Sequence, residues 1–201
     1  MDFWDIFSGE VSRGNALFFN GVLDLCCSDY NLLLMKCIIK DRKNIIEFTI
    51  NHAKENNQQI NYNDAMGNAA SHGQIDIVRY FLEKGANNYD FSLYSAVMRG
   101  HEEIIRLLIE KGANNHNQAI KYAVKFSMPN IVLLLIEYNK TDLTKALKYA
   151  SNNGCIPIAQ IIVEYASKNN IFLNYDIAIS YPETSDTSTF LKICQEGKRK
   201  I

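Results

Sequence analysis

The sequence predicts an all-α solenoid, a stack of short helix–turn–helix repeats, and three observations support this fold class. Small and apolar residues recur every 27 residues along the middle of the chain. Within each repeat the apolar residues follow the spacing of a helix face rather than that of a strand. Three prolines and ten glycines among 201 residues are too few for a loop-rich all-β protein. Because one such repeat cannot bury its own apolar face, neighbouring repeats are expected to stack.

The 27-residue period is clearest at an alanine, a glycine-or-serine and an isoleucine position. These are Ala69, Ala96, Ala123 and Ala150; Gly73, Gly100, Ser127 and Gly154; and Ile77, Ile104, Ile131 and Ile158. We expect the alanine in a first helix and the isoleucine in a second helix. The glycine or serine between them is expected to end the first helix, because glycine tolerates a positive φ.

Residues that favour helix N-caps define the start of each repeat. The predicted starts are Asn31, Asn63, Asp90, Asn117, Thr144 and Asp176. The first and fifth repeats are five residues longer, with polar insertions expected between repeats at 54–59 and 167–170. Residues 31–201 would then be the repeat region, and the repeat from Asp176 a C-terminal cap with a charged outer face over 196–200.

Residues 1–30 match the repeat poorly and are predicted to be a degenerate N-terminal capping segment. Two short helices are expected there, the second over 16–27. One side of the first would carry Phe3, Trp4, Ile6 and Phe7. This segment would cover the apolar face of the repeat that begins at Asn31.

The repeat resembles the ankyrin repeat family, most clearly in the segment YSAVMRGHEEIIRLLIEKGANN at 94–115. That segment carries the family's residues at Ala96, Gly100, His101, Ile104, Leu107, Leu108, Gly112, Ala113 and Asn114. The family's T-P-L-H signature is absent, and the period is 27 instead of the usual 33. The missing residues fall between Gly112 and Ala123, where the family has a projecting β-hairpin finger. The resemblance therefore implies an ankyrin-like α-solenoid with shortened or absent fingers.

The motif at 144–150 and the Asn/Lys/Ile-rich composition are similar to the divergent ankyrin repeats of giant viruses of amoebae. Ankyrin proteins bind other proteins in a concave groove lined by first helices and fingers. By position, this groove would contain Tyr94, Met98, Lys121, Lys125, Lys148 and Asn152. The mixture of methionine, tyrosine and lysine suits a partner with acidic character. The alternative interpretation is a lysine-rich face that is merely solvated.

The resemblance thus implies a protein–protein interaction module, a scaffold or a protein that engages a host factor. One alternative is an adaptor that recruits a partner to a ubiquitin ligase, although no segment has a convincing F-box pattern. Another is a self-associating structural protein. Fold resemblance alone does not specify the partner.

Aromatic residues precede several of the predicted caps, at Tyr30, Tyr62, Tyr89 and Tyr175. They could form an exposed edge that contacts a partner, or pack as hydrophobic staples against the first helix of each repeat. We favour the staple. His101 follows a helix-ending glycine and is expected to make a structural hydrogen bond.

The sequence contains no phosphate-binding loop, dinucleotide fingerprint, paired CxxC or catalytic motif. The four histidines lack metal-ligand spacing, so we expect no enzyme activity, cofactor or metal. A net charge of −1 argues against nucleic acid, and no apolar run is long enough to cross a membrane. Five cysteines, Cys26, Cys27, Cys37, Cys155 and Cys194, without a signal peptide indicate reduced thiols and an intracellular, cytoplasmic protein.

Overall fold

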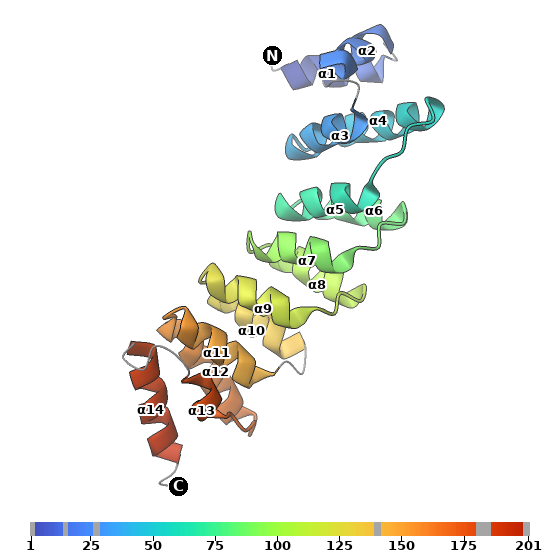
Figure 1. Ribbon diagram of the computed structural model, residues 1–201. Coiled ribbons are helices and arrows are strands. Elements are labelled where there is room, and N and C mark those ends of the chain that lie inside the picture. Colours follow the sequence, from blue (N-terminus) through green and yellow to red (C-terminus); the bar gives the residue numbers. More distant parts are fainter. Residues whose placement is uncertain (1–2, 14–15, 26–28, 139–141, 180–185, 199–201) are drawn as a thin grey trace. The chain divides into compact units, whose positions relative to one another are not determined.

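The computed structural model describes residues 3–13, 16–25, 29–138, 142–179 and 186–198, which form helices joined by short connections (Figure 1). These ranges contain no β-strand and no β-hairpin finger, which confirms the predicted all-α class. The chain divides into two compact modules, Met1–Ile104 and Ile105–Ile201.

The N-terminal module contains α1 (Phe3–Ser12), α2 (Ala16–Leu25), α3 (Tyr30–Ile39), α4 (Lys43–Glu55), α5 (Tyr62–Ser71), α6 (Ile75–Glu83) and α7 (Tyr89–Val97). The boundary between the modules falls within α8 (Glu102–Glu110). The C-terminal module contains α9 (His116–Lys125), α10 (Pro129–Tyr138), α11 (Leu143–Asn152), α12 (Ile156–Lys168), α13 (Tyr175–Ala178) and α14 (Asp186–Lys198).

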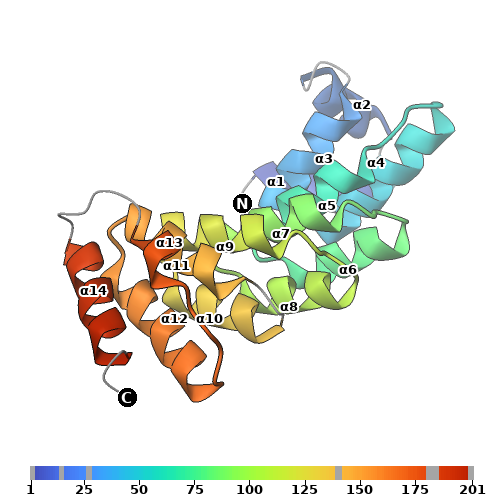
Figure 2. The same ribbon diagram turned by 60° about the horizontal axis from the view of Figure 1, so that its bottom comes forward.

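Each module is a stack of helix pairs. In the N-terminal module α3 packs on α4 and α5 packs on α6, while the first helices α3, α5 and α7 are successive neighbours. In the C-terminal module α9 packs on α10 and α11 packs on α12. There α9 lies beside α11 and α10 beside α12, so the first and second helices form two rows (Figure 2).

The core of each module is made from the residues that recur in the sequence. All four repeated alanines and all four repeated isoleucines are buried. Short side chains let the first helices approach closely, and Gly67 on α5 illustrates this. A methyl group added at Gly67 would lie 2.3 Å from Cε1 of Phe91 on α7, which is too close for any real contact.

The connections within and between helix pairs turn at left-handed residues. After the first helices, φ is positive at Asp41, Gly73, Gly100, Ser127 and Gly154. After the second helices, φ is positive at Asn57, Gly85, Gly112 and Asn170. The expected helix-ending role of the repeated glycine is therefore confirmed, with aspartate or serine taking the same conformation in two repeats.

The predicted N-caps are wrong by two residues. The caps, in repeat order, are Asp29, Asn61, Asn88, Asn115, Asp142 and Asn174. The side chain of Asn61, for example, accepts hydrogen bonds from the backbone N–H groups of Asn63 and Asp64. The predicted positions and the observed caps two residues earlier have the same 27-residue spacing and similar residue types. The period alone therefore could not show which of them are the caps.

The five-residue insertions do not lie wholly between repeats as expected. Asp41 and Asn57, the left-handed residues on either side of α4, are 16 positions apart, whereas Gly73 and Gly85 around α6 are 12 apart. Four inserted residues therefore lengthen the second helix, and one lengthens the connection to the next cap. Four residues are close to one helical turn, so the apolar face of α4 keeps its direction.

The first two helices pack against the rest of the N-terminal module. Phe7 of α1 and Phe19 of α2 are buried, and the Phe19 ring lies 4.7 Å from the rings of both Phe48 and His52 on α4. Ile6 is exposed, so the expectation that it shares a side with Phe7 is wrong. The side chains of Phe3 and Trp4 lie outside the described residues.

The last helix pair departs from the others. The first helix, α13, has only four residues, and α14 rests against α11, α12 and α13. Gln195 of α14 donates a hydrogen bond to Asp176 Oδ1 at 2.8 Å. Ile177, Lys192, Ile193 and Glu196 are exposed. Of the outer face predicted to be charged, the side chains of 197–200 lie outside the described residues.

Candidate interaction surface

The structure distributes the predicted groove residues over three first helices. Tyr94, which is half-buried, and Met98, which is 43% exposed, lie on α7 and directly after it in the N-terminal module. In the C-terminal module, the neighbouring helices α9 and α11 carry the remaining four, Lys121, Lys125, Lys148 and Asn152. The α9–α11 face, defined as the solvent-facing side of these two helices, is therefore a continuous surface that can be examined as one site.

The α9–α11 face is strongly basic. The two helices contain four lysines, Lys121, Lys125, Lys145 and Lys148, and no aspartate or glutamate. The second helices of the same module, α10 and α12, carry Glu137, Glu164 and Lys168. The chain has 21 lysines and arginines in all, so this face is distinguished by carrying lysines without any carboxylate on the same two helices.

Most of this positive charge is not neutralised by neighbours. Lys145 Nζ lies 3.2 Å from Asp142 Oδ2, an exposed pair that adds little stability. Lys121, Lys125 and Lys148 form no ion pair with any described residue. Lys125 Nζ lies 6.0 Å from the centre of the Phe126 ring, at the outer limit of a cation–π contact.

Sequence reasoning missed two tyrosines on this face. Tyr122 of α9 and Tyr149 of α11 occupy equivalent positions, 27 residues apart, and both are half-buried. Each directly follows a predicted groove lysine, so the same spacing that identified Lys121 and Lys148 could have found them. Lys145, which was also missed, extends the basic row at the N-terminal end of α11.

The aromatic residues near the caps do not form an exposed edge. Tyr30 and Tyr175 are buried, and Tyr62 and Tyr89 are half-buried. The Tyr30 hydroxyl lies 2.8 Å from His52 Nδ1 on α4, and burial raises the pKa of Tyr30. The Tyr62 ring lies 6.1 Å from that of Phe81 on α6. Tyr30 and Tyr62 therefore contact the second helix of their own repeat, a contact that the staple interpretation did not include.

His101 makes the structural hydrogen bond expected of it. Its Nε2 lies 3.1 Å from the backbone carbonyl oxygen of Ser71, which belongs to the preceding repeat. Gly73 leaves room for the imidazole, because a Cβ there would lie 2.7 Å from His101 Cε1. The histidine thus joins two repeats of the N-terminal module.

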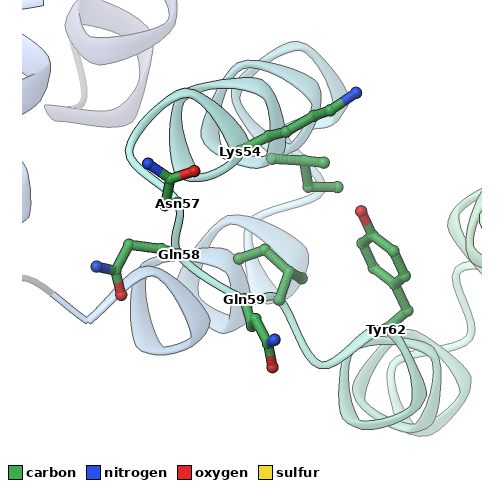
Figure 3. A pocket seen from close by; sticks show the side chains of 7 residues that line it. Lys54, Asn57, Gln58, Gln59 and Tyr62 are labelled. Carbon is green, nitrogen blue, oxygen red and sulfur yellow. The ribbon is translucent and has the colours of Figure 1, made fainter.

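A shallow hollow opens beside the first insertion (Figure 3). Its lining residues are Ile50, Lys54, Asn57, Gln58, Gln59, Ile60 and Tyr62. Lys54 and Tyr62 are the only titratable groups among these lining residues. Among the described residues, no three histidine, cysteine or acidic side chains come together as a metal site.

Two further observations concern membranes and thiols. No helix of the described residues is long and apolar enough to cross a membrane. Cys37, Cys155 and Cys194 are free thiols, as expected, whereas Cys26 and Cys27 lie outside the described residues.

The chain matches the family model for ankyrin repeats (3 copies) over two overlapping ranges, residues 34–119 and 93–174. No curated protein sequence matches the chain significantly. Together the two ranges span residues 34–174, well over half of the chain, and cover the helix pairs from α3 to α12. Ankyrin repeats generally mediate protein–protein interaction and are generally not enzymes. The stacked helix pairs, the buried alanines and this match show that the chain belongs to the ankyrin repeat family.

Proposed function

We propose that this protein is a protein-interaction module that binds its partner through the α9–α11 face. The observation that carries the proposal is the concentration of four lysines and no carboxylate on two neighbouring helices. Three of these lysines have no ion-pair partner among the residues that the structure describes, so an acidic surface that docks here would neutralise their charge. In the N-terminal module, taken by itself, Tyr94 on α7 and Met98 directly after α7 are proposed as further residues that contact a partner.

The partner is proposed to be an intracellular protein, since the free thiols suit a reducing compartment. The Asn/Lys/Ile-rich composition supports a viral source, in which case the partner would be a host protein. Recruitment to a ubiquitin ligase and self-association are the other roles that the experiment below would reveal by the identity of the captured protein.

Affinity capture with charge-reversed variants tests the proposal. The immobilised protein is compared with a variant in which Lys121, Lys125 and Lys148 are changed to Glu. A matched control changes Lys111, Lys168 and Lys192 to Glu, which are exposed lysines of the same module outside the face. We expect at least one protein to bind the original chain and the control but not the face variant. Circular dichroism checks that all three chains are equally helical.

Equal capture by the face variant and the control would overturn the proposal. A separate Met98→Glu variant tests the α7 contact, since Met98 is exposed in the N-terminal module. Loss of capture in this variant supports the contribution of α7, and unchanged capture restricts the site to the α9–α11 face.

A further inference from the structure

The residues of the α9–α11 face are arranged in rows that cross the two helices. Positions 27 apart occupy equivalent places on α9 and α11, which lie side by side. Lys121 and Lys148 therefore form one row, and Tyr122 and Tyr149 form a second row next to it. Within each row, the two residues are separated by the distance between the packed helices α9 and α11.

That spacing is about 8–10 Å, because packed helix axes are separated by this distance. An extended partner segment that crosses the helices must place one acidic group opposite each lysine. In a polyproline II helix every third residue returns to the same side after about 9 Å, at 3.1 Å per residue. A β-strand returns every second residue, after roughly 6.6 Å, and so does not match one repeat.

The tyrosine row favours the same conformation. Polyproline II segments dock in grooves lined by aromatic side chains, where proline rings pack on the aromatic faces. Tyr122 and Tyr149 are half-buried next to the lysine row in the helix sequence, so part of each residue is accessible to a partner. The lysines would attract the acidic residues of the partner, and the tyrosines would offer it an apolar surface that recurs from α9 to α11 in the same way.

We propose that the α9–α11 face binds a polyproline II segment in which an acidic residue recurs at every third position. The segment runs across α9 and α11, with its carboxylates on Lys121 and Lys148 and its intervening residues on Tyr122 and Tyr149. Lys125 and Lys145 lie on either side of the lysine row and strengthen its positive field. This inference rests on the proposed function and specifies the chemistry of the partner.

Fluorescence anisotropy with labelled peptides tests the spacing. The probe is a peptide of four Glu-Pro-Pro repeats, and the comparison peptide has the same composition with its glutamates gathered at one end. We expect the full chain to bind the regular peptide about tenfold more tightly, with binding that weakens as salt is added. A Gln-Pro-Pro peptide should not bind measurably.

Variants then assign the binding to the face. Changing Lys121 and Lys148 to Glu should abolish binding of the Glu-Pro-Pro peptide, whereas changing Lys111 and Lys168 to Glu should not alter it. Tyr149→Phe should retain binding, because the ring is kept, and Tyr149→Ser should weaken it several-fold. Circular dichroism of the Tyr149→Ser chain distinguishes lost contact from lost folding, and the lysine pair tests the assignment independently of that variant.

Equal binding of the regular and rearranged peptides would overturn the spacing, as would tighter binding of an oligothymidylate of matched charge. If no peptide binds while protein capture still depends on the three lysines, the polyproline II inference fails and the proposed function stands. If capture is also insensitive to the lysines, both fail.

Discussion

Asn63 holds two consecutive repeats together through a single side-chain oxygen. The backbone N–H groups of Asn87 and Asn88 both donate to Asn63 Oδ1, each at 2.8 Å. Asn31 and Thr144 make the corresponding bond, to the N–H groups of Asn61 and Asn174, at 2.9 and 3.3 Å. These residues lie two positions after the cap, and each binds the cap region of the following repeat. The described residues form no finger, and these side chains provide a polar link between the connections of neighbouring repeats.

Replacing Asn63 with Ala should loosen the link between its repeat and the next. Removal of one acceptor leaves two N–H groups to water, at a cost of about 1–2 kcal/mol. Amide hydrogen exchange measures the effect locally, and we expect faster exchange at Asn87 and Asn88. Asn63→Asp should retain protection, because it keeps the acceptor and aspartate occupies this position naturally at Asp90.

Asn61→Ala provides the matched control for the Asn63 variant. Asn61 caps α5 and accepts from the N–H groups of Asn63 and Asp64, so its loss should speed exchange at those two residues instead. If both variants affect the same amides, Asn63 acts as a cap and not as a link between repeats.

The period predicted the core because burial in a repeat depends mainly on local spacing. Ala123 and Ile131 are buried for the same reason as their equivalents, and helix periodicity is enough to identify them. The predicted caps were wrong because cap-forming residues recur every 27 residues in two registers, one that contains Asn61 and one that contains Asn63. The structure distinguishes them, because Asn63 binds the following repeat whereas Asn61 caps its own helix.

The 27-residue period predicted the lysines of the candidate surface but not its tyrosines. Lys121 and Lys148 lie on neighbouring helices because they share a position in the repeat. Tyr122 and Tyr149 share the next position, but adjacent helix residues point in different directions. Their partial exposure depends on how α9 and α11 pack, which the sequence pattern does not specify.

Changing Ser127 to Gly should stabilise the protein by about 0.5–1 kcal/mol. Ser127 has a φ of 52°, in the left-handed region that costs a residue with a Cβ roughly 1–2 kcal/mol. Gly100 and Gly154 take this conformation at the equivalent positions, with φ values of 75° and 66°. Part of the gain is offset because glycine is more flexible in the unfolded chain. Urea denaturation measures the difference.

Ser127→Ala separates backbone strain from side-chain contacts. Alanine keeps the Cβ and therefore the strain, but it removes the hydroxyl, which lies 3.7 Å from Cys155 Sγ. We expect no stabilisation in this variant. A gain equal to that of glycine would show that the hydroxyl, rather than φ, was responsible.

Ser92→Ala should also raise the free energy of unfolding, by about 1 kcal/mol. The Ser92 side chain is 0% exposed, and its hydroxyl has no hydrogen-bond partner among the described residues. A buried hydroxyl without a partner costs about 1–3 kcal/mol. Ala119 and Ala146 occupy the equivalent position, so the methyl group fits there. Thermal denaturation should show a higher midpoint.

The neighbouring Ser95 is the natural control for Ser92. Its hydroxyl donates to the backbone carbonyl of Phe91 at 3.0 Å, so Ser95→Ala removes a formed bond. We expect Ser95→Ala to be neutral or slightly destabilising. Stabilisation by both changes would point to a general gain in helix propensity instead of relief at Ser92.

The free energy of unfolding should decline above about pH 10, because tyrosines that are buried or half-buried in the folded state resist ionisation. Burial raises the pKa of Tyr80 above its ordinary value of 10.0, and the nearby Glu47 carboxylate and Tyr62 raise it further. Burial likewise raises the pKa of Tyr30 and Tyr175. The folded state therefore holds these protons more tightly than the unfolded state. Their contribution is fully present below pH 10 and is lost as the pH rises through the raised values.

Urea denaturation as a function of pH measures this loss, and Tyr80→Phe tests its origin. Phenylalanine keeps most of the packing and cannot ionise, so the free energy of unfolding should fall less steeply above pH 10 than in the original chain. Glu47→Gln should give an intermediate slope, because it removes the carboxylate but leaves the partial burial of Tyr80, the larger cause of its raised pKa, in place. If the slope of the free energy of unfolding against pH is unchanged in Tyr80→Phe, other groups cause the loss of stability at alkaline pH. A tyrosine with the same pKa in the folded and unfolded states would contribute nothing to this slope.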